Sequence, residues 1–185
     1  MMITLTGFMG SGKTTVGKVL ADFLGCPFMD LDDLVVKKAG KSIPDIFAQD
    51  GEPAFRQLEA QVLRKTVEKY AESTAVLALG GGAILAPASA APLHEKTVCI
   101  YLRATLDTLL ARLSGETAGR PLLQESPDQV GDDGGSVVMP GPDRASVSAR
   151  LASREPIYEE TAHVTIDTDG LSPDEVADEI IISAL

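Results

Sequence analysis

A glycine-rich string near the amino terminus constrains this chain more than any other feature. The string, Gly7-Phe8-Met9-Gly10-Ser11-Gly12-Lys13-Thr14, matches the pattern G-x-x-x-x-G-K-[ST]. An apolar, β-prone run precedes it at residues 2–6, and a helical pattern follows it at residues 16–24. A strand that leads through a glycine turn into a helix directs backbone N–H groups and the positive helix end at an anion. The string therefore predicts a site for the phosphates of ATP or GTP, rather than a turn that binds nothing.

The residue types in this loop predict individual roles. Lys13 is expected to reach the β- and γ-phosphates, and the Thr14 hydroxyl is expected to ligate Mg²⁺. Gly10 and Gly12 let the backbone approach the phosphates without a clash from a Cβ atom. The loop thus indicates the phosphate donor and leaves the acceptor open.

The composition bounds the size and the partners of the protein. With 185 residues, of which 44% are hydrophobic, the chain can form one domain with a substantial core. Its net charge of −11 and its 4% aromatic content argue against nucleic acids and acidic membranes as partners. We expect a monomer that acts on small molecules. Any Arg or Lys within a motif must create a local positive field in an acidic chain.

Cysteine usage and hydropathy predict the compartment. Cys26 and Cys99 lie apart in apolar stretches, which suits a reducing environment and indicates neither a disulfide framework nor a metal cluster. The first predicted strand begins at Met2, which leaves no room for a secretory signal. No apolar run approaches the roughly 18 residues of a membrane span. These features predict a cytoplasmic protein.

Strand-like and helical runs alternate along the chain. Strands are expected at residues 2–6, 28–29 with an end at 30–32, 74–79, 98–102 and 164–167, and helices at 13–24, 34–39, 43–49, 53–70, 106–113 and 172–182. Repeated strand–helix units predict a three-layer α/β/α fold with a central parallel sheet of about five strands. Ligands of such sheets bind at the carboxyl ends of the strands, where the phosphate loop, Asp30–Asp32 and Gly80–Gly82 are all expected.

Residues 124–142 interrupt this alternation. They contain four glycines, three prolines and three aspartates, and little apolar content besides Val137-Val138-Met139. We expect a long mobile loop beside the site rather than a linker between domains, because a final strand–helix unit follows it.

Asp30 and Asp32 follow the second predicted strand, next to the phosphate loop. Because side chains alternate along a strand, we expect both carboxylates to point into the cleft. One would lie near the metal and the other near the acceptor hydroxyl. The alternative is a pair of solvated carboxylates, one of which caps the next helix.

Arg56 and the triple glycine Gly80-Gly81-Gly82 are further candidates. Glu59 lies three residues after Arg56 on one helix face, where it can hold the guanidinium for a carboxylate ligand. Taken alone, a surface ion pair is the simpler interpretation of these two residues. Three glycines at a strand end indicate close approach of the backbone to another group, or else a flexible turn.

Three more arginines are candidate anion ligands. Arg120 stands at the start of the long loop, where it could close over the transferring phosphoryl group. Arg154 is a second candidate clamp, with a solvated helix charge as the alternative. Arg112 lies on a predicted helix, where it could flank adenine or face water. His94 and His163 have no partners at metal-ligand spacing and are expected to be structural.

Together, these residues resemble the shikimate kinases, a family of small phosphate-loop kinases of aromatic amino-acid biosynthesis. The matching strings span nearly the whole chain in the family's order: residues 7–15, 28–32, 40–47, Gly51-Glu52 with Phe55-Arg56 and Glu59, 80–83, 120–123 and 154–158.

The resemblance implies transfer of the γ-phosphoryl group of ATP to the 3-hydroxyl of shikimate, with Mg²⁺ as cofactor. It implies nucleotide binding by Gly10, Ser11, Gly12, Lys13, Thr14, Thr15, Arg112 and Arg120, and shikimate binding by Asp32, Arg56, Gly80, Gly81, Gly82 and Arg154. By the same likeness Lys13, Asp32 and Arg120 are catalytic, with Asp32 placed as a base, and Thr14 and Asp30 serve the metal. Residues 31–70 would form a substrate-binding subdomain and residues 113–145 a lid.

The chain departs from the family pattern in two places. Residues 124–142 look like an acidic, glycine-rich insert that makes the lid longer than usual. The stretch 167–173 lacks the family's frequent Arg on the adenine side, so contacts to the base would come from backbone, Pro173 or Arg112.

Other functions fit parts of the pattern. A small kinase for gluconate or a nucleotide would share the phosphate loop, but it would not need Asp32, Arg56 and the triple glycine together. A GTP-dependent switch would need an Asn-Lys-x-Asp motif, and the chain contains no Asn. An ATP-binding protein without transfer activity is disfavoured by the presence of Lys13, Asp32 and Arg120.

Overall fold

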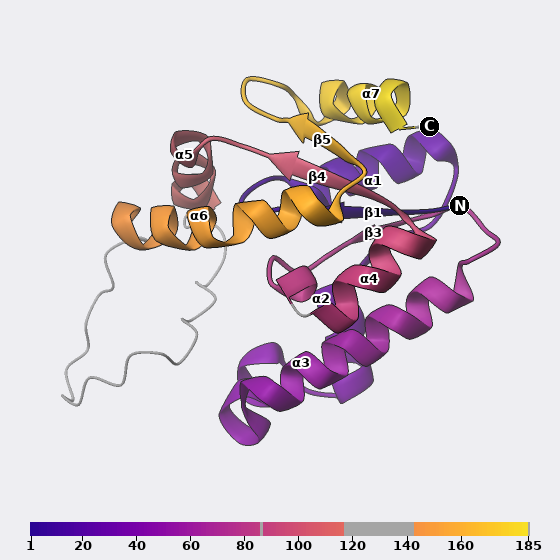
Figure 1. Cartoon of the computed structure of the whole chain (residues 1–185), viewed down its shortest axis with the longest axis vertical. Coiled ribbons are helices and arrows are strands. Elements are labelled where there is room, and N and C mark those ends of the chain that lie inside the picture. Colours follow the sequence, from indigo (N-terminus) through magenta and orange to yellow (C-terminus); the bar gives the residue numbers. More distant parts are fainter. Residues whose placement is uncertain (86, 117–142, 185) are drawn as a thin grey trace.

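A five-stranded parallel sheet forms the centre of the computed structural model, which describes residues 1–85, 87–116 and 143–184 (Figure 1). Its strands are β1 (Met2–Thr6), β2 (Phe28–Asp30), β3 (Ala75–Ala78), β4 (Val98–Arg103) and β5 (Val164–Asp167). They lie in the order β2-β3-β1-β4-β5, and every neighbouring pair is parallel. The predicted α/β fold with a five-stranded parallel sheet is therefore confirmed.

Helices cover both faces of this sheet. Helices α1 (Lys13–Leu24) and α7 (Pro173–Ala184) pack on one face, and their apolar residues form one core with β1, β3, β4 and β5. The other core takes in α2 (Leu31–Ala39), α3 (Ile43–Lys69), the short 3-10 helix η1 (Ala83–Leu85), α4 (Pro87–Lys96), α5 (Leu106–Glu116) and α6 (Arg144–Thr161). Figure 1 shows α7 and α3 on opposite sides of the strands.

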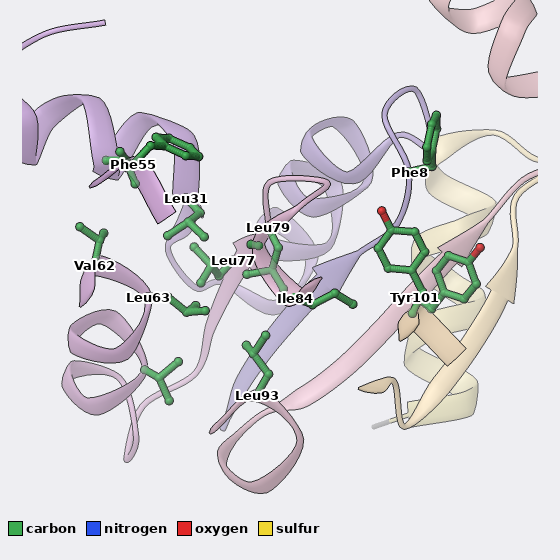
Figure 2. Close-up of a cluster of buried hydrophobic side chains, with 14 of the residues drawn as sticks. Phe8, Leu31, Phe55, Val62, Leu63, Leu77, Leu79, Ile84, Leu93 and Tyr101 are labelled. Carbon is green, nitrogen blue, oxygen red and sulfur yellow. The ribbon is translucent and has the colours of Figure 1, made fainter. Parts of the chain in front are cut away.

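The central strands supply apolar side chains to both cores. Ile3 and Leu5 of β1 pack with α1 and α7, while Met2 of the same strand belongs to the opposite core. Figure 2 shows that opposite core, in which Leu77 of β3 belongs to the same cluster as helix residues such as Leu63 and Leu93. Burial on both faces explains why these strands read as continuous apolar runs rather than as alternating ones.

The boundary between β2 and α2 differs from the prediction. The strand ends at Asp30 and the helix begins at Leu31, whereas the sequence predicted a strand end reaching Asp32 and a helix from Leu34. The cause is a helix cap, because the Asp30 carboxylate accepts a hydrogen bond from the Asp32 N–H at 3.0 Å. The argument from strand alternation therefore does not apply to Asp32, which lies in the first turn of α2.

Helix α3 joins the two helices that were predicted at residues 43–49 and 53–70. Ser42 caps its start, as expected, and accepts a hydrogen bond from the Asp45 N–H at 3.3 Å. Gly51 separates the two segments with non-helical angles, φ +79° and ψ 169°, which are accessible essentially to glycine alone. The kink fixes the direction of the segment that carries Arg56.

Helices α4 and α6 were not predicted. Both contain prolines, Pro87 and Pro92 in α4 and Pro156 within α6, and proline usually signals a helix end in sequence. Among the described residues, none of the helices combines the length and the apolar character needed to cross a bilayer. The same part of the chain contains no group of three or more His, Cys, Asp or Glu side chains arranged to hold a metal ion.

Candidate active site at the sheet edge

The loop between β1 and α1 is built on glycines in left-handed or extended positive-φ conformations. Gly7 has φ +143°, and a Cβ atom there would lie 2.6 Å from the Leu102 carbonyl oxygen of β4. Gly12, with φ +95°, occupies the N-cap of α1. The loop therefore curves tightly against the sheet and leads directly into the amino end of a helix, which is the geometry that favours a bound phosphate.

Lys13 lies at the centre of this loop. Its Nζ donates hydrogen bonds to the carbonyl oxygens of Gly7 at 2.9 Å and Phe8 at 2.8 Å. Thr14 and the exposed Thr15 follow in the first turn of α1, and Ser11 is buried beneath the loop. The predicted nucleotide-binding residues Gly10 to Thr15 thus lie together in the loop and the first turn of α1, and the loop's own carbonyls hold the Lys13 ammonium.

Asp30 connects the loop to the second strand. The Thr14 hydroxyl donates a hydrogen bond to Oδ2 of Asp30 at 3.0 Å, while Oδ1 caps α2. The sequence left a choice between a helix cap and a place near the metal, and the two oxygens of Asp30 allow both. A hydroxyl and a carboxylate side by side are the hard oxygen ligands that Mg²⁺ prefers, so this pair fits the predicted metal.

Asp32 is a largely buried carboxylate that lies close to several charges. Burial and the negative charge of Asp30 raise the pKa of Asp32, while Lys13 and Arg56 partly oppose this shift. The structure thus places Asp32 near both the phosphate loop and Arg56, although it does so from a helix rather than from a strand. A carboxylate with a raised pKa in such a position is suited to accept a proton.

Arg56 lies between two glutamates of its own helix. Its Nη1 donates to Glu59 at 2.9 Å, and its Nε and Nη2 both donate to one oxygen of Glu52 at 3.3 Å. Glu59 is buried, which raises its pKa, and the Arg56 guanidinium opposes that shift. The predicted Arg56–Glu59 pair is therefore present, and it is anchored in the protein rather than solvated.

The turn at Gly80–Gly82 lies against both of these charged groups. A Cβ atom on Gly80 would lie 2.8 Å from Oδ1 of Asp32, and one on Gly82 would lie 2.8 Å from Nη2 of Arg56. Gly81 faces the phosphate loop, since its Cβ position is 3.6 Å from the Gly7 carbonyl oxygen. Close approach, rather than flexibility, thus accounts for these glycines.

Arg154 reaches the same region from α6. Its guanidinium lies 5.8 Å from the centre of the Phe8 ring, in the phosphate loop. It also lies near the buried Tyr158, where burial raises the pKa of the hydroxyl and the charge of Arg154 opposes the shift. Arg154 is thus a half-buried helix residue beside the phosphate loop, and its role as an anion clamp stays a prediction.

Arg112 bonds to the protein's own backbone. Its guanidinium donates to the Thr168 carbonyl at 2.9 Å and hydroxyl at 3.0 Å, and to the carbonyls of Gly10 and Ser11 at 3.4 and 3.3 Å. It thus ties the phosphate loop to the segment that follows β5. Its predicted place beside adenine stays a prediction.

Some predicted residues lie outside the described part of the chain, and two residues with contacts in this region were not predicted. Arg120 and residues 124–142 are the former. Sequence reasoning gave no role to Tyr158, whose hydroxyl donates to the Gly81 carbonyl at 2.5 Å, or to Glu52. Both belong to strings that matched the family pattern, and their spacing from Arg154 and Arg56, one helix turn each, was the available signal.

Comparison with known proteins gives one consistent family. The family model described as shikimate kinase matches residues 9–184. A shikimate kinase of Salinibacter ruber is 45% identical over 169 residues, which cover 91% of this chain and 78% of that protein. A shikimate kinase of Enterococcus faecalis is 39% identical over 180 residues, covering 97% of this chain and 95% of that one.

A solved structure of a shikimate kinase has a similar fold. The shikimate kinase from Acinetobacter baumannii, determined in complex with shikimate, superimposes with a TM-score of 0.78. It shares 33% sequence identity, and the match covers 97% of this chain and 90% of that one. The likeness thus covers nearly the whole α/β fold.

Proposed function

The chain belongs to the shikimate kinase family of ATP-dependent phosphotransferases, and from that premise we propose that its sheet-edge site transfers the γ-phosphoryl group of ATP to the 3-hydroxyl of shikimate. One observation carries the proposal: Asp32 and Arg56 flank the Gly80–Gly82 turn, which itself lies against the phosphate loop. A carboxylate, a carboxylate-binding guanidinium and a phosphate site are thereby brought together within one small space. That combination suits a hydroxylated carboxylic acid as the acceptor.

The donor side of the proposed reaction is formed by the loop and the start of α1. The backbone of Gly10–Thr15 would bind the phosphates of ATP, with Lys13 neutralising charge on the transferring group. Thr14 and Asp30, which already contact each other, would hold Mg²⁺. When bound, this ion neutralises charge on the β- and γ-phosphates. Arg112, and Arg120 beyond the described residues, would complete the nucleotide side.

The acceptor side is formed by α2, α3, α6 and the glycine turn. Arg56 and Arg154 would bind the shikimate carboxylate, and Gly80, Gly81 and Gly82 would admit its ring close to the backbone. Asp32 would accept the proton of the 3-hydroxyl while that oxygen bonds to the γ-phosphorus and the bond to ADP breaks. The raised pKa of Asp32 supports this role, since a proton acceptor works best when its pKa approaches the operating pH.

We further infer a division of labour along the chain. Residues 31–70, which include α2 and α3, would act as the substrate-binding subdomain, and residues 113–145 as the lid. The enzyme would work as a monomer, since this one chain supplies Lys13, Asp32 and Arg56. Light scattering on the purified protein would test the monomer, and a dimer mass at working concentration would contradict it.

A coupled assay of ADP release tests the proposed reaction. The purified protein is supplied with ATP and Mg²⁺, and with shikimate, quinate, gluconate or a nucleoside monophosphate as acceptor. We expect turnover with shikimate at least about tenfold above that with each other acceptor, because a site built to pair a substrate's polar groups rejects analogues that leave them unpaired. Folded protein that releases ADP equally with all acceptors, or with none, would contradict the proposal.

A further inference from the structure

Glu52 covers an edge of Arg56 that a carboxylate ligand would need. A guanidinium binds a carboxylate best through two parallel hydrogen bonds from one of its edges. The Nε/Nη2 edge of Arg56 is directed at a single oxygen of Glu52, and both distances are 3.3 Å. These are long for a charge-assisted hydrogen bond, which typically measures about 2.7–2.9 Å. The edge is therefore occupied, but by a contact with poor geometry.

The two glutamates that pair with Arg56 differ sharply in their surroundings. The Glu59 side chain is 4% exposed and lies 2.9 Å from Nη1, whereas the Glu52 side chain is 45% exposed. A half-exposed ion pair contributes little, since water screens it and solvates either partner when the pair separates. Glu59 is thus a fixed partner of Arg56, and Glu52 is a replaceable one.

Charge in this region makes replacement favourable when another carboxylate arrives. Asp32 and Glu59 are both largely buried, and burial raises the pKa of each. The charges of Asp32 and Glu52 raise the pKa of Glu59 further, since all three carboxylates lie near Arg56. A ligand carboxylate would be the fourth in this region, after Asp32, Glu52 and Glu59. Its binding would cost free energy through charge repulsion unless Glu52 moved away.

The position of Glu52 gives its side chain somewhere to go. It directly follows Gly51, whose non-helical backbone interrupts α3, and it precedes Pro53, which suits the first turn of a helix. A carboxylate at the amino end of a helix segment is stabilised by the helix dipole without any side-chain partner. Glu52 can therefore leave Arg56 for solvent and keep a favourable environment.

We propose that Glu52 is a competing carboxylate that holds the substrate edge of Arg56 and is displaced by the carboxylate of shikimate. This inference rests on the proposed function, in which Arg56 binds that carboxylate. It makes Glu52 a specificity-determining residue, because only a ligand that brings its own negative charge can replace it. Ligands of the same shape without the charge leave the Glu52–Arg56 pair in place.

Calorimetric titration of shikimate and of its methyl ester tests the inference with Glu52→Gln and Glu52→Ala. Removing the competitor should tighten shikimate binding by about two- to fivefold, the range that an exposed ion pair of up to about 1 kcal/mol allows. Binding of the neutral ester should change by less than about twofold, since it gains nothing from a freed Arg56 edge. Glu68→Gln, which removes the same charge from an exposed position of α3, is the matched control and should leave both affinities unchanged.

Two outcomes would overturn the inference. Unchanged or weaker shikimate binding in Glu52→Gln would mean that Glu52 supports Arg56 instead of competing, and equal tightening for the ester would mean that charge competition is not the cause. Arg56→Lys distinguishes failure of the Glu52 inference from failure of the proposed function. This variant keeps the positive charge but loses the paired hydrogen bonds to a carboxylate. Weaker shikimate binding in Arg56→Lys with no gain in Glu52→Gln overturns the Glu52 inference alone. No effect in Arg56→Lys overturns the carboxylate-binding role as well.

Discussion

Asp32 is the residue at which the chemistry of the site works against the stability of the fold. Burial, together with the charge of Asp30, raises the pKa of its carboxyl, so the folded chain holds this proton more tightly than the unfolded chain does. A carboxyl of this kind destabilises the fold at every pH above its folded pKa, where it is ionised. This loss of folding free energy disappears below the pKa that the Asp32 carboxyl has in the unfolded chain, because the carboxyl is then protonated in both states.

Asp32→Asn should therefore stabilise the protein and inactivate it. At pH 7 to 8 the melting temperature should rise above that of the wild type, and the difference should vanish as the pH falls below about 4, the ordinary range of Asp. The kcat should fall on the order of 10²-fold or more, the usual contribution of a positioned base. Melting curves across pH, with kcat from the coupled assay, measure both effects.

Asp22→Asn is the control for Asp32→Asn, since it removes the same charge from an exposed position on α1. It should leave kcat unchanged. As the pH is lowered, kcat/KM of the wild type should begin to fall at a higher pH than it would with an ordinary Asp as the base. The reason is that the proton acceptor, Asp32, has a raised pKa. A kcat of Asp32→Asn within about threefold of the wild type would mean that Asp32 is no base.

At the scale of elements, the Gly80–Gly82 turn is where β3 meets the charged side chains of α2 and α3. The Leu79 N–H donates to the Leu5 carbonyl at 2.9 Å, which brings the turn beside the end of β1. The Tyr158 hydroxyl holds the turn from α6 through the Gly81 carbonyl. Hydrogen bonds to β1 and α6 thus hold the turn in place, and it has little freedom to move away from an added methyl group.

Alanine substitutions along the turn should have graded effects. In Gly80→Ala, the new Cβ would meet Asp32 at 2.8 Å and Glu59 at 3.2 Å, so stability should fall by about 1–3 kcal/mol, as overpacking usually costs. In Gly82→Ala the new Cβ would meet the Arg56 guanidinium at 2.8 Å, so Arg56 must shift and the KM for shikimate should rise by about tenfold. Urea unfolding and steady-state kinetics give the two quantities.

Gly81→Ala supplies the stability reference for this series. Its Cβ would have only ordinary contacts, at 3.6 Å or more, so its unfolding free energy should stay within about 0.5 kcal/mol of the wild type. If Gly80→Ala were as stable as Gly81→Ala, the close approach of the turn to Asp32 would not be a real constraint on this site.

The sequence predicted elements well where one local signal decided them. The phosphate loop, the buried strands and the Ser42 cap each depend on a short pattern, and each was placed correctly. Helices α4 and α6 were missed because their prolines outweighed a helical pattern that tertiary packing stabilises. Asp32 lies near Lys13 and Arg56, but it does so from the first turn of α2 rather than from a strand, because Asp30 caps that helix.

At the scale of the whole molecule, the order of the strands decides what the site contains. Strand β1 lies at the centre of the sheet, between β3 and β4, so its loop faces both the glycine turn and the segment after β5. The sequence predicted a shared sheet edge but gave no strand order, because parallel pairing depends on contacts far apart in the chain. Arg112 shows the consequence, as its partners lie 56 and about 100 residues away.

Arg112 connects the first and last strand–helix units of the fold. Its hydrogen bonds to Thr168, and to the carbonyls of Gly10 and Ser11, hold the phosphate loop against the segment that follows β5. Thr168 is buried, so its carbonyl and hydroxyl would lose partners that water does not readily replace. Arg112 should therefore fix the shape of the nucleotide side while leaving the acceptor side alone.

Arg112→Met should raise the KM for ATP by about tenfold or more, because hydrogen bonds from a charged group contribute roughly 1.5–3 kcal/mol. The KM for shikimate at saturating ATP should stay within about twofold, since the hydrogen bonds of Arg112 in the described part of the chain go to Gly10, Ser11 and Thr168, on the nucleotide side. Arg64→Met is the matched control, since it removes the same charge from an exposed position of α3. Equal effects on both KM values, or an ATP effect as large in Arg64→Met, would show that Arg112 supports the fold in general rather than the nucleotide side.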